Sequence, residues 1–278
     1  MTKPGRGTAI ATLFLALAAL SGQSFAGQGR YVSMGSSYAA GPGVGTRDAA
    51  SGECGRSLSN YARTVAARHR LQLVDVACSG ATTANLLDHG QHVLPAQVEA
   101  VTPDTTLVSI LIGGNDVAYV GDLFGFTCRA AGKADCKVTE GAELERRLAA
   151  LPAALDRVVD AVRSRAPGAR IVLVGYLPGL SDDGAACPAL PLAPADARRM
   201  RDTERRLAEV FERTAQRNRV ALVRAAALGA GHEICTSDNY LTGYRPAKVD
   251  SWREPVAYHP NQAGMDRIAR EFDRILGR

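Results

Sequence analysis

The sequence predicts an α/β protein built on a five-stranded parallel β-sheet with helices on both faces. Five short apolar runs of strand length recur along the chain, and stretches with helical spacing of apolar residues separate most of them. The third run, Thr105–Ile112, is apolar enough to be buried on both faces. Such alternation requires right-handed crossovers between parallel strands, which place helices on both sides of the sheet.

The predicted elements follow one another in a regular order. The expected strands are Tyr31–Met34, Leu71–Ala77, Thr105–Ile112, Arg170–Tyr176 and Val220–Val223. The expected helices are Leu58–His69, a weakly periodic segment Thr82–Ala100, the segment Leu144–Val162, a strongly charged helix Pro194–Asn218 and a final helix Gln262–Leu276. The region Asp116–Gly141 is expected to be irregular.

The amino terminus has the pattern of a secretory signal peptide. Lys3 and Arg6 precede the twelve-residue apolar run Ala9–Leu20, and Ser24-Phe25-Ala26 is a small-x-small cleavage pattern. The run is shorter than the roughly 20 residues that a membrane-spanning helix needs. We therefore expect residues 1–26 to be removed on export, and residues 27–278 to form a single secreted domain, extracellular or periplasmic.

The charge pattern bears on nucleic-acid binding, and the cysteine content bears on disulfides and metal sites. The formal net charge of +5 falls to +3 without the signal peptide, and the basic residues are interleaved with acidic ones, so nucleic-acid binding is not expected. Six cysteines in an exported chain, without a CxxC pair or a His-rich neighbour, favour three disulfides over a metal site. Spacing alone does not fix their connectivity.

Polar loops are predicted at the carboxyl ends of strands, where open α/β sheets bind their ligands. Gly35–Gly41 follows the first strand, Ala77–Ala81 the second and Gly113–Asp116 the third, while Tyr258–Asn261 precedes the last helix. A lone loop serine more often caps a turn than performs catalysis. The four loops together indicate a composite site.

These loops supply what ester hydrolysis requires: a nucleophile, a base for its proton, and donors for the developing oxyanion. Ser37 is the expected nucleophile and His259 the expected general base. The backbone N–H groups of Ser37 and Gly80, with the side-chain amide of Asn115, are expected to form the oxyanion hole. Acyl transfer of this kind needs no cofactor and no metal.

At these residues the chain resembles the SGNH (GDSL-like) hydrolase family, whose four blocks carry Ser, Gly, Asn and His in this order. The resemblance covers nearly all of the mature chain and is greatest to secreted bacterial lipases and phospholipase-like esterases. The matching segments are Tyr31–Tyr38, Ala77–Gly80, Ile112–Asp116, Gly231–Cys235 and Tyr258–Pro260. The resemblance implies a flavodoxin-like three-layer α/β/α sandwich and the disulfides Cys54–Cys78, Cys128–Cys136 and Cys187–Cys235.

The chain departs from the family pattern at two positions. Ser36 replaces the usual Asp before the nucleophile, and aligning Gly35 and Tyr38 with the family leaves Ser37 as the reactive serine. Val256 replaces the Asp that normally orients the histidine three residues later. A main-chain carbonyl can perform this orientation, so we expect a Ser–His dyad. The carbonyl of Val256 or Ala257 could serve, and the carboxylates of Glu254 and Asp250 are rivals.

Other side chains near these motifs have more ordinary interpretations. His232 is expected in loop structure or cleft lining, since one His with one Glu is a poor metal set. Asp116 is expected to cap a turn or to orient the amide of Asn115. Trp252 and Tyr258 could line an acyl pocket, although packing explains a lone Trp equally well.

The sequence therefore predicts a secreted serine esterase or lipase that forms an acyl-enzyme on Ser37. The expected partners are small-molecule or lipid esters, with at most transient contact with lipid surfaces, and the protein is expected to be a monomer. A polysaccharide acetyl esterase of the same fold is the alternative enzyme. A secreted binding protein with impaired catalysis is the alternative outside the enzymes, because of Ser36 and Val256.

Overall fold

A computed structural model describes residues 1–2, 29–182, 184, 186–245 and 256–277. The predicted signal peptide therefore lies almost entirely outside the described residues. A five-stranded parallel sheet with the order β2-β1-β3-β4-β5 forms the middle layer. Its strands are β1 (Arg30–Gly35), β2 (Gln72–Asp75), β3 (Thr105–Leu111), β4 (Arg170–Val174) and β5 (Ala221–Val223). The predicted class is confirmed.

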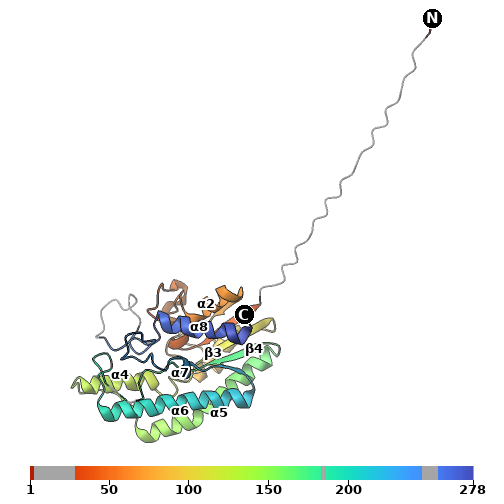
Figure 1. Cartoon of the computed structure of the whole chain (residues 1–278). Helices are drawn as coiled ribbons and strands as arrows, with labels where there is room; N and C mark the ends of the chain where they lie inside the picture. The colour runs from red at the N-terminus through yellow and green to blue at the C-terminus, as the bar shows by residue number, and fades with distance from the viewer. Residues whose placement is uncertain (3–28, 183, 185, 246–255, 278) are drawn as a thin grey trace.

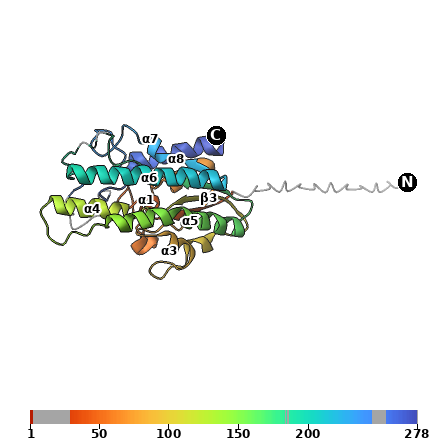
Figure 2. The same ribbon diagram turned by 90° about the horizontal axis from the view of Figure 1, so that it is seen from below.

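Helices cover both faces of this sheet (Figures 1 and 2). The longer ones are α2 (Tyr61–His69), α4 (Tyr119–Ala130), α5 (Gly141–Arg165), α6 (Pro194–Asn218) and α8 (Gln262–Leu276). The shorter ones are α1 (Ser37–Ala40), η1 (Ala49–Cys54), α3 (Thr83–Leu87), η2 (Gln97–Ala100) and α7 (Ala225–Leu228). Helices α2 and α8 pack together on one face, and α5 packs on α6 on the other. This is the expected three-layer sandwich.

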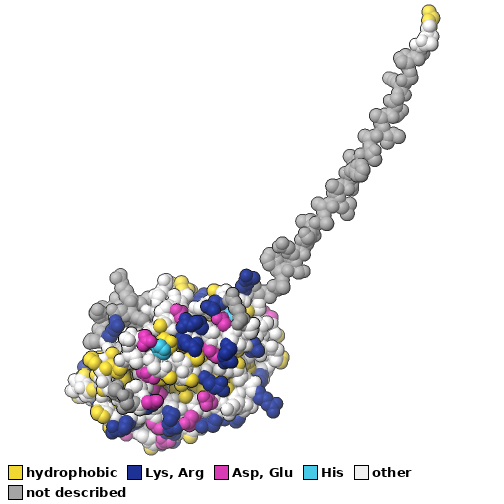
Figure 3. Space-filling model, in the orientation of Figure 1, with side chains coloured by type: hydrophobic (Ala, Val, Ile, Leu, Met, Phe, Trp, Pro, Cys, Tyr) yellow, Lys and Arg dark blue, Asp and Glu magenta, His cyan; other side chains and the backbone are white. Residues whose placement is uncertain are grey.

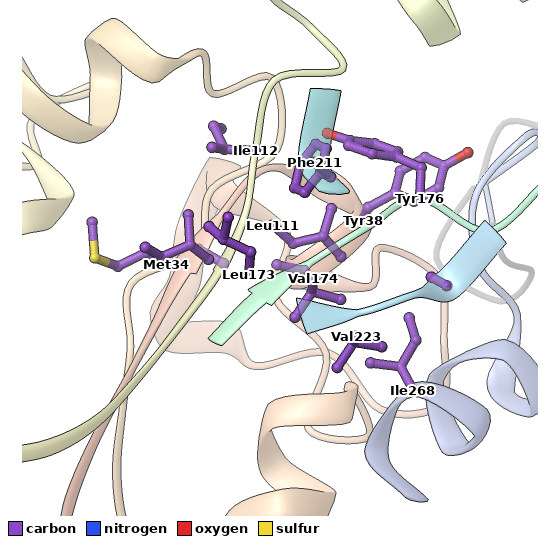
Figure 4. Packing of buried hydrophobic residues seen from close by; sticks show 14 of the residues in the cluster. Met34, Tyr38, Leu111, Ile112, Leu173, Val174, Tyr176, Phe211, Val223 and Ile268 are labelled. Atoms are coloured by element: carbon purple, nitrogen blue, oxygen red, sulfur yellow. The ribbon is translucent and has the colours of Figure 1, made fainter. Parts of the chain in front are cut away.

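Apolar side chains from strands and helices form one continuous core. The strands are buried along most of their length, as expected for a parallel sheet covered on both faces. Figure 4 shows this packing for side chains of four strands and two helices: Met34, Leu111, Leu173, Val174, Val223, Phe211 and Ile268.

Helix α4 corrects the expectation that Asp116–Gly141 is irregular. Ala118, in the left-handed conformation at φ 54°, precedes the helix and offers no capping side chain, so the usual start signal is missing. Gly121 and Gly125 also weaken its helical pattern. A Cβ at Gly125 would lie 2.0 Å from the carbonyl oxygen of Lys137, so this glycine permits close packing of the following loop.

The weakly periodic segment Thr82–Ala100 also differs from the prediction. It contains only the five-residue α3 and the four-residue η2. A loop joins them, in which Gly90 packs so closely that a Cβ would clash with the carbonyl oxygen of Leu94. The helical spacing of the apolar residues here does not reflect a continuous helix.

Three disulfides join loops to one another or to the helical elements η1 and α4. The bonds are Cys54–Cys78, Cys128–Cys136 and Cys187–Cys235, the pairing that the family resemblance implies. Cys54–Cys78 joins the end of η1 to the loop after β2. Cys187–Cys235 joins the loop after β4 to the loop after α7. Both therefore brace the end of the sheet where the strands finish.

The surface shown in Figure 3 carries Lys and Arg side chains scattered among Asp and Glu. On α6 these charges pair along the helix, as in Arg205 with Asp202 and Glu209. Among the helices that the structure describes, none is both long and apolar enough to cross a membrane.

Candidate active site

The predicted nucleophile begins a short helix directly after β1. Ser36 donates its backbone N–H to the carbonyl oxygen of Leu111 at 3.0 Å, and Ser37 is the first residue of α1. Gly35 makes this turn possible, because a Cβ there would lie 2.4 Å from the same Leu111 oxygen. The side chain of Gln97 binds both backbone groups of Gly35 at 2.7 and 2.9 Å. The serine is therefore held by the ends of β1 and β3.

The predicted base lies in the loop before α8. The backbone of His259 pairs with Thr242, which accepts from Tyr258 N–H at 2.7 Å and donates to the carbonyl oxygen of His259 at 2.9 Å. Asn261 then caps α8 by accepting from the backbone N–H of Gly264 at 3.0 Å. The loop thus has a fixed anchor on each side of the imidazole.

The structure brings Ser37 and His259 together across 222 residues of sequence. Nε2 of His259 lies 2.7 Å from Oγ of Ser37, and Nδ1 lies 2.9 Å from the carbonyl oxygen of Ala257. Because a carbonyl can only accept, Nδ1 carries the proton and Nε2 presents its lone pair to the serine hydroxyl. Of the groups considered for orienting the imidazole, the carbonyl of Ala257 makes the contact. Glu254 and Asp250 lie outside the described residues.

Burial keeps the imidazole neutral. Only 6% of His259 is exposed, and desolvation lowers the pKa of its ring to about 4, against a smaller opposing effect of the Ala257 carbonyl. The ring is therefore unprotonated at neutral pH and able to accept a proton from Ser37.

A cavity of about 540 Å³ opens over this pair. Gly80 and Asn115, the other predicted oxyanion-hole residues, line it together with Ser37 and His259. Gly80 has φ 82°, a left-handed conformation that glycine adopts without steric cost because it has no Cβ. One N–H of the Asn115 amide donates to the carbonyl oxygen of Ala81 at 2.8 Å, which fixes the amide and leaves its second donor for a ligand.

The site lies where parallel sheets of this order bind ligands. In the order β2-β1-β3-β4-β5, the chain changes direction across the sheet between β1 and β3. Ser37 follows β1 and Asn115 follows β3, so both stand at this switch point. The topology explains why residues from separate motifs meet.

Two residues beside the site have supporting contacts. Asp116 accepts from the backbone N–H of Thr83 at 3.1 Å and from its hydroxyl at 2.5 Å, at the first turn of α3. It therefore binds the start of a helix that precedes it in the sequence, which is neither of the two roles expected of it. Ser36 is 2% exposed and does not line the cavity. Ser37, in contrast, lines the cavity.

Side chains farther from the base have structural contacts. His232 stacks on Tyr240 with ring centroids 4.0 Å apart and has Nδ1 2.9 Å from a carboxylate oxygen of Asp238, as expected for loop structure. Tyr258 packs its ring against Phe124 and Tyr244. Trp252 lies outside the described residues. Among the described residues, no three His, Cys, Asp or Glu side chains form a metal-binding group.

Sequence reasoning missed the tyrosines behind the imidazole. Tyr38 has its ring centroid 5.2 Å from that of His259 and donates its hydroxyl to the carbonyl oxygen of Tyr258 at 2.6 Å. Tyr38 was expected only to mark the motif. Figure 4 shows it beside Tyr176, and the two ring centroids are 4.7 Å apart.

A flavodoxin-like sheet with a serine–histidine pair and amide donors at its switch point is an arrangement suited to the hydrolysis of carboxylic esters. The chain belongs to the GDSL-like lipase/acylhydrolase family, whose model matches residues 33–267. It is therefore an ester hydrolase, as its sequence predicts.

Known relatives agree with this membership. A lipase from Streptomyces rimosus is 32% identical over 238 residues, which are 85% of this chain and 82% of that protein. A phospholipase A1 from Streptomyces albidoflavus has a similar structure, with a TM-score of 0.72 and 28% identity over 89% of this chain and 99% of that one. An extracellular lipase from Streptomyces rimosus has a TM-score of 0.70 and 28% identity over 88% and 98% of the two chains.

Proposed function

We propose that the protein is a secreted serine esterase or lipase that hydrolyses carboxylic esters through an acyl-enzyme on Ser37. The observation that carries this proposal is the dyad geometry: the serine hydroxyl lies 2.7 Å from Nε2 of an imidazole whose other nitrogen is held by Ala257. A neutral base at hydrogen-bond distance from a serine in an open cavity is what nucleophilic catalysis requires.

In the first half of the reaction, Oγ of Ser37 attacks the ester carbonyl carbon while Nε2 of His259 takes its proton. The carbonyl oxygen becomes an oxyanion, for which the backbone N–H groups of Ser37 and Gly80 and the amide of Asn115 are the donors. The bond to the alcohol oxygen then breaks, and His259 returns the proton to this leaving group. The alcohol departs and the acyl group stays on Ser37.

In the second half, His259 takes a proton from water, and the resulting oxygen attacks the acyl carbon. A second oxyanion forms in the same place. Its collapse breaks the bond to Oγ, which receives the proton from His259. The acid leaves, and the dyad returns to its starting state without a cofactor.

The setting of this activity is also a proposal. The signal-peptide pattern of residues 1–26, the three disulfides and the relative described as an extracellular lipase support export of residues 27–278 as a single domain. Relatives named lipase and phospholipase A1 favour lipid esters among the possible substrates. We propose a monomer whose contact with lipid surfaces is at most transient.

A fluorophosphonate probe tests the nucleophile directly. We expect the folded protein to be labelled at Ser37, and the Ser37→Ala variant to remain unlabelled. If folded wild-type protein is not labelled, the binding-protein alternative gains support and the enzyme proposal fails. Hydrolysis rates over a series from acetate to long-chain esters, with acetylated sugars in parallel, then separate a lipase from an acetyl esterase.

A further inference from the structure

One face of helix α4 carries no charge although it is not buried. Val120, Gly121, Phe124 and Cys128 recur along it at helical spacing, and each is exposed or half-buried; they form the outer strip of α4. The other face of the helix packs into the core. A surface helix normally places polar and charged side chains away from the core, as α6 does, so this strip needs another explanation.

The outer strip of α4 begins inside the catalytic cavity. Val120 and Gly121 line this cavity together with the proposed nucleophile, base and oxyanion donors. The backbone N–H of Ala118 donates to the carbonyl oxygen of Asn115 at 3.1 Å, so the helix starts within one turn of the predicted oxyanion hole. A Cβ at Gly121 would have no neighbouring atom within 4 Å. The absent side chain of Gly121 therefore leaves open space in the cavity wall.

The strip continues from the cavity toward the surface. Phe124 lies one turn after Gly121, about 4.5 Å farther along the helix axis, and Cys128 lies about 10.5 Å farther. The ring of Phe124 packs edge-on against Tyr258 with the centroids 5.1 Å apart, yet 37% of the residue stays exposed. An apolar track thus leads out of the cavity along α4.

The cavity has another wall of a different character. Arg47, Glu53 and Ser79 line it from η1, the segment before η1 and the loop after β2. Hydrocarbon placed against charged groups removes their water, which is unfavourable. The acyl part of a lipid ester is hydrocarbon, whereas its alcohol part carries further oxygen atoms. The outer strip of α4 therefore suits the acyl chain, and the polar wall suits the alcohol.

We propose that the acyl chain of the ester lies along the outer strip of α4, and that Gly121 determines which chain lengths can enter this track. The inference rests on the proposed function, because the acyl group is the part of the substrate that becomes attached to Ser37. An extended chain advances about 1.2 Å per bond, as an extended peptide does, so an octanoyl group reaches about 8 Å beyond its carbonyl carbon. Such a chain passes Phe124 and ends before Cys128.

Contact with the strip should make the specificity constant rise with acyl length. Each methylene group that leaves water for an apolar surface strengthens binding by up to about fourfold. With the alcohol kept the same, we expect kcat/KM of the wild type to be at least about tenfold higher for an octanoate than for an acetate.

The test compares Gly121→Leu and Gly121→Ala with the control Gly141→Leu. Gly141 is the exposed first residue of α5, also has no atom within 4 Å of a Cβ, and does not line the cavity. The substrates are nitrophenyl acetate, butanoate, hexanoate and octanoate. We expect Gly121→Leu to lower the octanoate-to-acetate ratio of kcat/KM at least about tenfold, because its side chain fills the start of the track. Gly121→Ala should lower the ratio less, and Gly141→Leu should keep the wild-type ratio.

A second series distinguishes the acyl chain from the alcohol. Acetates of alcohols of increasing length carry the added hydrocarbon on the leaving group. We expect the dependence of kcat/KM on alcohol length to be the same in Gly121→Leu as in the wild type. A loss in Gly121→Leu that grows with alcohol length would place the alcohol on α4 and overturn the proposal.

Three further results would also overturn it. They are a wild-type ratio near one, a wild-type ratio in folded Gly121→Leu, or an equal change in Gly141→Leu. Replacing a helical glycine raises helix propensity, so melting temperatures should not fall, and Gly121→Ala decides if Gly121→Leu does not fold. Failure of the proposed function gives a different result, because the wild type would then hydrolyse none of the esters and would not be labelled by a fluorophosphonate.

Discussion

The half of the site that holds the proposed nucleophile and the half that holds the proposed base are built in different ways. Ser37, Gly80 and Asn115 each follow a strand of the sheet, and backbone hydrogen bonds between neighbouring strand ends, such as Ser36 N–H to Leu111, place them. His259 stands in an irregular loop that Thr242 and Tyr38 hold from distant parts of the chain. The sheet therefore positions one half of the site, while hydrogen bonds to a loop outside the sheet position the other.

The largest expected loss of kcat follows from replacing either Ser37 or His259. We expect Ser37→Ala and His259→Ala each to lower kcat by roughly 10⁴- to 10⁶-fold, since members of such a unit act together. Ester turnover and fluorophosphonate labelling measure the loss.

Ser36→Ala is the matched control for Ser37. It removes the hydroxyl of a buried residue that does not line the cavity, so we expect at most about a tenfold loss, the effect of a misplaced neighbour rather than a lost nucleophile. Labelling that disappears in Ser36→Ala but persists in Ser37→Ala would show that the adjacent serine is the nucleophile.

Removing disulfides should affect the stability of the two sides differently. Cys187–Cys235 spans 48 residues and braces the side of the base, whereas Cys54–Cys78 spans 24 residues beside Gly80. From chain entropy, we expect the double Ala variants to lose about 4 and about 3.5 kcal/mol of unfolding free energy, respectively. Urea unfolding of the two variants gives the order. Cys128–Cys136, which spans only 8 residues, serves as the reference with a loss of about 2.5 kcal/mol.

Asn115→Ala should affect the oxyanion side alone. Loss of one preorganised donor lowers kcat by roughly 10²- to 10³-fold, with little change in KM, because the donor meets full negative charge only in the transition state. Steady-state kinetics on a soluble ester measure both constants. Asn218→Ala, which removes a surface amide bonded to Asp156, should retain the wild-type kcat. A purely KM effect at Asn115 would assign that side chain to ground-state binding.

The proposed role of His259 as the base predicts a particular dependence of kcat/KM on acid pH. Because burial lowers the pKa of His259 to about 4, the ring stays neutral and kcat/KM should hold down to about pH 5, then fall tenfold per unit below about pH 4. The unfolded chain takes up this proton near its ordinary pKa of about 6.5, so it binds more protons than the folded state between these values. Stability therefore falls as the pH drops through this window. A fall in kcat/KM already centred near pH 6.5 would contradict a buried neutral base.

The fold was largely predictable because its elements carry strong local signals. Helix α8 begins after Asn261, a capping residue, and α6 begins with Pro194, so the bounds of both agree with the prediction. The sequence did not predict helix α4, because Gly121, Gly125 and the uncapped Ala118 weaken its local helical signal. Gly125 allows the backbone of Lys137 to pack closely against the helix, and helix propensity alone does not reveal such a contact.

The residues of the site also fall into those that the sequence predicts and those that only the structure shows. The sequence could place Ser37, Gly80 and Asn115 at one site because each follows a predicted strand in a recognisable motif. Tyr38 and the carbonyl that it binds are 220 residues apart, and such pairing leaves no trace in local sequence.

The smallest expected effect is at Glu254, the carboxylate that competes with a main-chain carbonyl for orienting the base. Since Ala257 already accepts from Nδ1 at 2.9 Å, we expect Glu254→Ala to retain kcat within about threefold, well under 1 kcal/mol of transition-state stabilisation. Asp250→Ala should behave alike. A carboxylate that truly held the imidazole would cost roughly 10⁴-fold when removed, as its loss frees the wrong tautomer. These outcomes differ by three orders of magnitude, so initial rates with one ester decide whether the base side relies on the main chain alone.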